Sequence, residues 1–476
     1  MTNIHSRPLL GALLLAALTA GFAACSRKEG CTDPLATNYD PDAQRDCCCA
    51  YATGKTFTIT DLGNGVKQVQ GETDQDVTLT SGTKWLLHGF VYVNSGATLT
   101  IEPGTVIKGD KDSKATLVVR RGGRFHAEGT STQPIVFTSA QPAGQRAPGD
   151  WGGIIVCGKA PVNLQGGEGT IEGGVDATFG GYDATHSSGI LRYIRIEFSG
   201  VPFQPNQEIN GLTLGGVGSG TTIDHIQVSY NGDDSYEFFG GTVNVKHLVA
   251  LASWDDDFDM DNGYAGKGQF LVALRDPAIA DQSGSNGLEH DNDGQGTAAA
   301  PFTAPVLSNV SIFGPQATPG TIINGSFKRA GHLRRNTHSK VFNSVFAGFP
   351  TGLVVDGAAC EANADGGDLK VRRCVYSAMG TLTGVASGST WDIQSWFTAG
   401  GNVSVDDNGA LGVADPFQLT APGFQLTGGS MLADGAAFGE PELNDPFFEQ
   451  VPHRGAFGTQ DWTAGWCNWD PQHTPY

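Results

Sequence analysis

The feature that most constrains the fold of this chain is a unit of sequence that occurs twice between residues 226 and 263. The first copy reads IQVSYNG and then DDSYEFFGG, and the second reads LVALASW and then DDDFDMDNG. Asp233 corresponds to Asp255, 22 residues on (255 − 233 = 22), and Glu237 corresponds to Asp259 by the same offset. A period in the low twenties, made of a short alternating run and a polar turn closed by glycine, is typical of a solenoid coil. The alternation is that of a β-strand and is too short for a helix.

Short runs of the same kind extend from Trp85 to residue 377. They are separated by small turns such as NSG and EPG, and no helical pattern interrupts them. This favours a parallel β-helix over a sandwich, because each strand then pairs with its equivalent in the next coil. The glycine-rich residues 166–189 lack the pattern, and we expect a lateral loop there. The runs lie at 89–93, 97–101, 105–108, 116–120, 124–127, 135–138, 149–156, 194–200, 309–314, 343–348 and 374–377.

Composition supports a packed all-β chain rather than a disordered one. Hydrophobic residues make up 39% of the 476, and 68 glycines can supply the many turns. The net charge of −20 argues against nucleic acid or an anionic membrane surface as a partner, because both attract cationic patches. Beyond residue 380 the period fades, and we expect an aromatic-rich C-terminal cap over the open end of the solenoid. Its candidate residues are Phe417, Phe424, Phe447, Phe448, Trp462, Trp466 and Trp469.

The N-terminus has the order of an export signal. Arg7 precedes the apolar run 9–20, which is shorter than a membrane span, and small residues then lead to Cys25. The two alanines before Cys25 make this segment resemble a bacterial lipobox, in which that cysteine is lipidated and becomes the mature N-terminus. Phe22 stands where such a motif usually has leucine. The alternative is ordinary secretion, with Cys25 as a spare thiol.

An exported, oxidising context makes disulfides the default for the other cysteines. Residues 47–49 are three consecutive cysteines, too compact for a metal knuckle, so we expect one of them to pair with Cys31. Cys360 and Cys374 are candidates for a second bridge. Residues 30–51 resemble a small Cys-bounded module of secreted Bacteroidetes proteins. Its oxygen-bearing side chains suit either a Ca²⁺ site or, as we expect here, a turn-rich spacer with a disulfide. They are Asp33, Asn38, Asp40, Asp42 and Asp46.

Several separated blocks resemble a family of exported Bacteroidetes proteins, whose members often carry the label "multidrug transporter". The blocks are LTIEPGTVIKG at 99–109, RAPGDWGGII at 146–155, EINGLTLGGV at 208–217 and DPAIAD at 276–281. The resemblance covers residues 85–357 and implies a right-handed parallel β-helix, but no particular activity. The sequence contradicts the transporter label, since nothing after residue 25 is apolar enough to span a membrane. The predicted organisation is a signal peptide (1–24), a Cys-rich tether (25–54), a β-helix (55–380) and C-terminal coils with a cap (381–476).

The repeated turns carry the richest candidate site. If the two copies stack in register, their carboxylates lie about 4.8 Å apart, coil on coil. Like charges at that spacing repel unless a cation binds between them or one is protonated, so we predict a Ca²⁺ site. The alternative is a solvated acidic face whose aspartates cap their own turns. The predicted ligands are Asp233, Asp234, Glu237, Asp255, Asp256, Asp257, Asp259 and Asp261, and a further acidic turn follows at 289–294.

The same carboxylates suit a catalytic hypothesis. β-Helical pectate lyases use Ca²⁺-binding aspartates with an arginine base, and polygalacturonases use three aspartates. This chain has an adjacent aspartate pair at 233–234, like polygalacturonases. Residues 331–333 read GHL where those enzymes have a GHG block, and their RIK block is absent. We therefore expect no catalysis; if the protein is an enzyme, its acid–base candidates are Asp233, Asp234, Asp255 and Asp257. The basic stretch 328–338 is expected to pair with surface carboxylates rather than to bind an acidic sugar.

The predicted function is a surface role outside the cell. Trp254 and Tyr236 flank the acidic turns and are candidate ligand-binding residues if they are exposed, or core residues if they are buried. We expect an exported protein, lipid-anchored in the outer membrane and exposed at the cell surface, that binds Ca²⁺ and a polysaccharide or another envelope protein. One alternative is a polysaccharide lyase or glycoside hydrolase acting at the acidic face. Another is a purely architectural adhesion element, and nucleic acid is not an expected partner.

Overall fold

The computed structural model describes residues 28–33, 38–49, 56–204 and 207–476. It divides the chain into two compact units, residues 1–53 and 54–476. Cys25 and the export signal lie outside the described residues, so their roles stay predictions. Among the residues that are described, none belongs to a helix long and apolar enough to cross a membrane.

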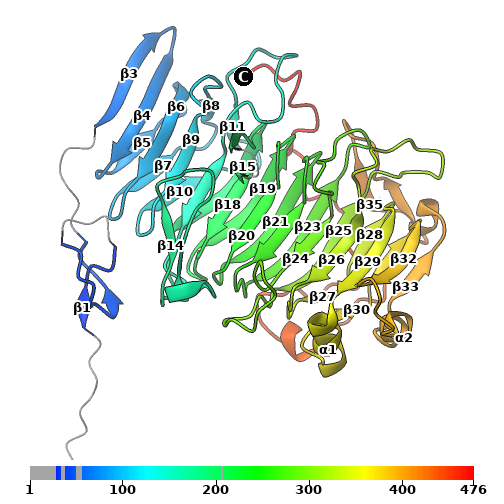
Figure 1. Ribbon diagram of the computed structural model, residues 1–476. Helices are drawn as coiled ribbons and strands as arrows, with labels where there is room; N and C mark the ends of the chain where they lie inside the picture. The colour runs from blue at the N-terminus through cyan, green and yellow to red at the C-terminus, as the bar shows by residue number, and fades with distance from the viewer. Residues whose placement is uncertain (1–27, 34–37, 50–55, 205–206) are drawn as a thin grey trace, which may run out of the picture. The chain divides into compact units, whose positions relative to one another are not determined.

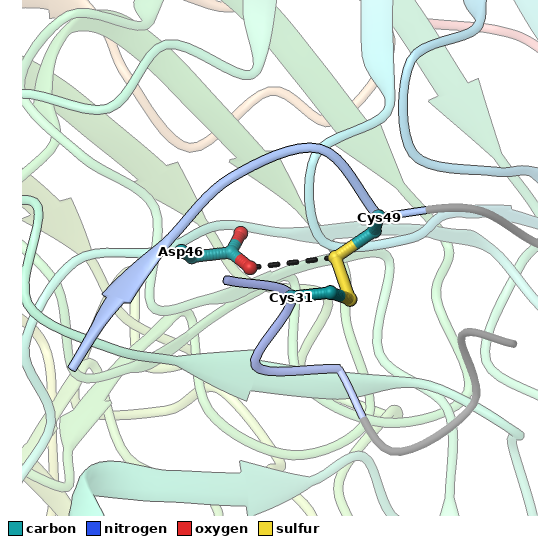
Figure 2. A group of neighbouring side chains, drawn as sticks. All are labelled: Cys31, Asp46 and Cys49. Atoms are coloured by element: carbon teal, nitrogen blue, oxygen red, sulfur yellow. Dashed lines mark hydrogen bonds between the residues drawn. A yellow bond between two sulfur atoms is a disulfide. The ribbon is translucent and has the colours of Figure 1, made fainter. Parts of the chain in front are cut away.

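The first unit is small and held by a disulfide. Strand β1 (Glu29–Gly30) pairs in parallel with β2 (Arg45–Asp46), and the expected disulfide joins Cys31 to Cys49. Figure 2 shows Asp46 beside this bridge. Because both sulfurs are used in the bond, neither remains as a thiolate to bind a metal. Asp40 pairs with Lys28 at 2.7 Å, and Asp46 accepts a hydrogen bond from the Thr32 amide.

The second unit is a parallel β-helix, as the 22-residue repeat predicted (Figure 1). Its strands form three columns, and within each column a strand pairs in parallel with its equivalent in the next coil. In the register, Ile194 pairs with Ile226 and Ile226 with Leu248, while Glu237 pairs with Asp259. The predicted stacking of the two copies is therefore confirmed.

The first column carries the candidate functional site. Its strands are β9 (Thr116–Val119), β12 (Ile154–Cys157), β18 (Leu212–Gly215), β20 (Tyr236–Phe239), β22 (Phe258–Asp261), β24 (Leu288–His290), β26 (Arg329–Arg334), β29 (Thr351–Asp356) and β32 (Thr381–Val385). The second column contains β5 (Val77–Leu79), β7 (Thr98–Ile101), β10 (Arg124–Glu128), β27 (Lys340–Phe342) and β30 (Lys370–Arg372). The third contains β8 (Val106–Gly109), β11 (Ile135–Ser139), β28 (Val345–Ala347), β31 (Val375–Ser377) and β33 (Val403–Val405).

Five longer strands turn the corner between the second and third columns. They are β15 (Gly189–Glu197), β19 (Thr222–Ser229), β21 (Asn244–Leu251), β23 (Lys267–Leu274) and β25 (Val306–Phe313). Each bends at one residue with a left-handed backbone, such as His225 (φ 56°) and His247 (φ 51°). The rings at this corner stack from coil to coil, with centroids 4.4 Å apart for Tyr193 and His225, 4.2 Å for His225 and His247, and 5.3 Å for His247 and Phe270.

The remaining elements close the first coil or project from the β-helix. Strand β3 (Phe57–Gly63) pairs antiparallel with β4 (Val66–Thr73), and β4 pairs in parallel with β6 (Lys84–Val93). The predicted lateral loop contains η1 (Gln165–Gly167) and the hairpin of β13 (Glu168–Thr170) with β14 (Thr178–Gly180). Smaller hairpins pair β16 (Pro202–Gln204) with β17 (Gln207–Glu208), and β34 (Val413–Asp415) with β35 (Gly423–Leu426). The helices are α1 (Ala358–Gly366), α2 (Ile393–Ala399), η2 (Asn408–Leu411) and η3 (Pro441–Leu443).

The predicted cap is wrong in its position. The C-terminal aromatic residues do not cover the open end of the solenoid. Helix α2 lies at the last coil instead, where Phe397 packs on Tyr376. The segment after β33 runs back along the side of the β-helix, so that Lys108 of β8 donates to the carbonyl of Tyr476 at 3.1 Å (Figure 1). Most of its aromatic rings pack on the outer face of the third column, whose residues are apolar on both sides of the sheet, whereas Phe447 and Phe448 pack with Phe342 of β27 in the second column.

Amide side chains fasten this C-terminal segment to successive coils. Gln227 both donates to the carbonyl and accepts from the amide of Asn468, at 2.9 and 2.8 Å. Gln269 holds the backbone of Glu449 in the same way, at 2.8 Å for both bonds. The predicted bridge between Cys360 and Cys374 is wrong, because both are free, buried thiols, the first in α1 and the second between β30 and β31.

Candidate functional site: an acidic cavity

The outward positions of the first column carry a row of polar side chains. Tyr236, Phe238, Phe258 and Met260 are fully buried in the core. Because strand residues alternate between faces, the residues between them, Glu237 and Asp259, lie on the outer face. The register extends this row to Glu289 and His332 on the next two strands.

The turns before these strands form a ladder of side-chain oxygens. The Asp234 amide donates to the Asn210 side chain (3.2 Å), the Asp256 amide to Asp234 (2.6 Å) and the Asn286 amide to Asp256 (2.5 Å). Each link joins one coil to the next. At one end of the ladder the acceptor is the neutral amide side chain of Asn210, so the negative charge of Asp234 and Asp256 is not needed for this structural role.

Beside the ladder lies a cavity of about 800 Å³, which we call the acidic cavity. Among the described residues that line it, none is lysine, arginine or histidine, and Trp254 is 43% exposed at its wall. The Ser283 hydroxyl donates to Asp255 at 2.7 Å. Seven carboxylates contribute to the lining: Glu172, Glu208, Asp233, Asp234, Glu237, Asp255 and Asp281.

The carboxylates approach one another closely enough to share cations. Three overlapping sets each have their oxygens within 4.8 Å of one another. Ca²⁺ binds oxygen ligands at about 2.3–2.6 Å, so two ligands of one ion lie no more than about 5 Å apart. The sets are Asp233, Asp234 and Asp255; Asp234, Glu237 and Asp259; and Asp256, Asp259 and Glu289.

The pKa values of these groups reflect burial among like charges. Burial, followed by the neighbouring carboxylates, raises the pKa of Asp233, Asp234 and Glu237 well above the usual range. Burial raises the pKa of Asp255 to about 6, and Asp281 adds to this while the Ser283 hydroxyl opposes it. One Asp259 oxygen is buried without a hydrogen-bond partner among the described residues. Among the described residues that line the cavity, no basic side chain offers these carboxylates a counter-charge.

Six of the eight predicted metal ligands belong to these sets, and two do not. Asp257 faces Arg275, whose Nε lies 3.1 Å from its carboxylate, and both side chains are fully buried. Asp257 is therefore the counter-ion of a core arginine rather than a metal ligand or an acid–base residue. Asp261 accepts a hydrogen bond from Asn262 at 2.7 Å and lies in none of the sets.

The two predicted ligand-binding aromatic residues have different environments. Trp254 lines the acidic cavity and is exposed. Tyr236 is fully buried, and its hydroxyl lies 2.7 Å from the Ile226 carbonyl and 2.9 Å from that of Val249. The prediction for Tyr236 as a ligand-binding residue is therefore wrong, because it is a core residue with a satisfied hydroxyl.

Three of the basic residues in the stretch 328–338 pair with carboxylates, as predicted, whereas Lys328 donates to a backbone carbonyl and His338 stacks on Phe302. Arg334 pairs with Glu289 and with Asp291, and Arg335 lies 2.7 Å from Asp291. His332 lies between Glu289 (3.1 Å) and Asp356 (3.0 Å). We call these six side chains the ion-paired patch: Glu289, Asp291, His332, Arg334, Arg335 and Asp356.

Sequence reasoning missed Glu172, Glu208 and Asp281. All three belong to segments between the repeated strands, where no period indicates which residues meet. Glu289 was recognised only as part of a further acidic turn. It is the register partner of Asp259 at an offset of 30 residues (289 − 259 = 30), because a loop lengthens that coil. Alignment of LEH at 288–290 with FDM at 258–260 was the available signal.

Comparison with known proteins agrees with this fold. Residues 71–411 match the family described as the pectate-lyase-like beta-helix domain, and the chain belongs to that family. Among solved structures, the crystal structure of pectate lyase Pel9A is similar, at 14% sequence identity and a TM-score of 0.36. That match covers 77% of this chain and 89% of the other. No curated protein matches the sequence.

Proposed function

We propose that this protein is a surface-exposed β-helical protein that binds Ca²⁺ in the acidic cavity and carbohydrate at the same face. The observation that carries the proposal is the set of seven carboxylates around one cavity with no basic residue among its described lining. Two carboxylates 4.8 Å apart repel by about 3 kcal/mol at an effective dielectric constant of about 20. A bound divalent cation converts this repulsion into attraction.

Ca²⁺ fits this cavity better than Mg²⁺. Ca²⁺ accepts six to eight oxygen ligands in flexible geometry, whereas Mg²⁺ requires a near-ideal octahedron and retains several waters. The acidic cavity offers many carboxylate oxygens from separate turns, and the three sets share Asp234 and Asp259. Exposed Trp254 at the cavity wall supports the carbohydrate part of the proposal, because an aromatic ring offers an apolar face beside polar groups.

Terbium luminescence tests the metal proposal. Tb³⁺ replaces Ca²⁺ at oxygen sites and emits when a nearby tryptophan is excited, and Trp254 lines the cavity. We expect saturable emission that added Ca²⁺ abolishes. The variant Trp254→Phe should lose most emission yet retain Ca²⁺ affinity, which separates sensitisation from binding. Emission that Ca²⁺ does not displace would contradict a Ca²⁺ site in the acidic cavity.

The proposal includes a lipid anchor at Cys25 and attachment to the outer membrane. It rests on the order of charge, apolar run and small residues before Cys25 in the sequence. The full precursor should partition into the detergent phase after expression in a bacterium that lipidates exported proteins. Cys25→Ala should move it to the aqueous phase, and an unchanged partition would refute the anchor.

Hydrolysis of a polysaccharide is a second candidate function. It is favoured by Asp255, whose pKa of about 6 suits a general acid near neutral pH. A lyase is less favoured, because no arginine, lysine or histidine appears among the described lining residues to act as base. Release of reducing ends from plant or microbial polysaccharides, lost in Asp255→Asn, would establish hydrolysis. Absence of release with intact carbohydrate binding would leave the binding function, and absence of both would favour a purely architectural element.

A further inference from the structure

A second cavity, of about 510 Å³, lies between the corner of the β-helix and the C-terminal segment. We call it the C-terminal pocket. His247 and Phe270, at the left-handed corner positions of β21 and β23, line one side. His453, Asp461 and Trp462 of the C-terminal segment line the other. The pocket exists because the C-terminal segment runs along the coils rather than over their end.

The walls of the C-terminal pocket are held in place before any ligand arrives. Gln269 binds both backbone polar groups of Glu449, and Asn309 donates to the His453 carbonyl at 2.9 Å. The Ala456 amide donates to the Ser311 hydroxyl at 2.9 Å. These side chains come from consecutive coils, so the segment cannot shift without breaking several bonds. A site formed in advance loses less conformational entropy on binding.

The lining combines aromatic rings with hydrogen-bonding groups. Phe270 and His453 have ring centroids 6.4 Å apart, and Trp462 stacks on Phe457 at 4.9 Å, which fixes its orientation. The Nε2 atom of His453 is buried and has no hydrogen-bond partner among the described residues. Burial lowers the pKa of His453, so its imidazole is neutral at pH 7. A ligand that offers a hydroxyl would satisfy this nitrogen.

The negative charges around the C-terminal pocket disfavour the binding of anionic ligands. Glu449 and Asp461 both line it, and the nearby Lys246 is already paired with Glu449 at 2.7 Å. A pyranose ring carries one apolar C–H face and a rim of hydroxyls, which match an aromatic wall beside carboxylates and an imidazole. The pocket volume lies within the usual range for small-ligand sites, about 300–1,000 Å³.

We propose that the C-terminal pocket binds a neutral saccharide unit, independently of Ca²⁺ and of the acidic cavity. This inference goes beyond the proposed function, which places Ca²⁺ and carbohydrate at the first column. Trp462 supplies the stacking surface, Phe270, which is 6% exposed, adds apolar wall beside it, and His453 and Asp461 bind hydroxyls. The two sites lie on different corners of the coils, so the protein has two separate binding faces.

Saturation-transfer NMR and tryptophan fluorescence test this proposal on the full chain in excess EGTA. The probes are neutral tetrasaccharides of glucose, mannose or galactose, with tetragalacturonate as the acidic comparison. We expect at least one neutral probe to bind and tetragalacturonate not to bind. His453→Leu should weaken binding about tenfold, the loss expected for one hydrogen bond. Trp391→Phe, which alters a tryptophan outside the pocket, should leave it unchanged.

Two comparisons keep this result separate from the Ca²⁺ proposal. Asp233→Asn/Asp255→Asn should bind the neutral probe like the wild type, and His453→Leu should still bind Tb³⁺. If His453→Leu does not fold, Gln460→Ala, at an exposed position of the pocket lining, takes its place. No binding of any neutral probe at millimolar concentration would overturn the inference. Equal binding by wild type and the pocket variant would also overturn it, by placing the saccharide elsewhere.

Discussion

The acidic cavity and the ion-paired patch occupy the same outer face of the first column, but they differ in whether their carboxylates have basic partners. In the patch, each carboxylate meets a base: Glu289 meets Arg334 and His332, and Asp291 meets Arg335. On the two preceding strands, Glu237 and Asp259 belong to sets of carboxylates and neither forms an ion pair with a described residue, although Arg334 acts on Asp259 from farther away. The fold can evidently place arginine opposite a carboxylate at this face. The lack of a basic residue among the described lining of the acidic cavity is the difference on which the proposed cation site rests.

The largest expected effect comes from Arg275, a buried base next to the acidic turns. Arg275 pairs with Asp257 and also donates to the carbonyls of Ser253, Asp255 and Asn286. Arg275→Met should lower the free energy of unfolding by about 3–5 kcal/mol, because it leaves the buried Asp257 carboxylate with the Ser253 hydroxyl but no ion-pair partner. Denaturant unfolding measures this. Arg275→Met/Asp257→Leu should recover much of the loss, and no recovery would show that the backbone bonds matter more than the charge pair.

A smaller effect should convert the ion-paired patch into a second acidic cavity. Arg334→Met removes the base shared by Glu289 and Asp291, and should cost about 1–3 kcal/mol of stability. Ca²⁺ should then restore part of the loss, because Glu289, which belongs to the set with Asp256 and Asp259, is left with His332 and Asp291 is left with Arg335. Thermal melting with Ca²⁺ or EGTA checks this. A loss of stability that Ca²⁺ does not reduce would break the parallel between the two regions.

The acidic cavity should give the protein's stability a modest dependence on pH. Burial raises the pKa of Asp255 to about 6 in the folded state, above its value in the unfolded chain of about 3.9. The folded state then binds more protons between these values, so stability without Ca²⁺ should rise as the pH falls from 7 to 5. Saturating Ca²⁺ should remove this rise in melting temperature, and Asp255→Asn should reduce it. A melting temperature that falls with pH under EGTA would contradict the assignment.

How much could be predicted from sequence depends on whether residues lie within the repeat. The offset of 22 residues placed Glu237 beside Asp259, because parallel coils pair equivalent positions. It could not reveal Glu172 or Asp281, which reach the cavity from loops of irregular length. Nor did it show that Asp257 faces inward, since its partner Arg275 lies in the following strand-to-turn segment.

The C-terminal segment illustrates a second limit. Its aromatic content correctly indicated that it buries apolar surface, but aromatic residues fit the end of a solenoid and its side equally well. Polar side chains far away in sequence, such as Gln227 and Gln269, hold the segment against the side of the solenoid. Their amide groups form hydrogen bonds with its backbone. A local sequence pattern cannot predict such long-range hydrogen bonds.

Calcium titration by calorimetry tests the central claim most directly. Three proteins would be compared: the wild type, Asp233→Asn/Asp255→Asn, and Asp112→Asn/Asp406→Asn, which removes the same charge from two exposed positions elsewhere. The account predicts saturable Ca²⁺ binding by the wild type and the exposed-site control, and its loss from the cavity variant. Without Ca²⁺, the cavity variant should also melt at a higher temperature than the wild type, because repulsion is relieved. No binding by the wild type, or equal binding by all three, would contradict a Ca²⁺ site in the acidic cavity.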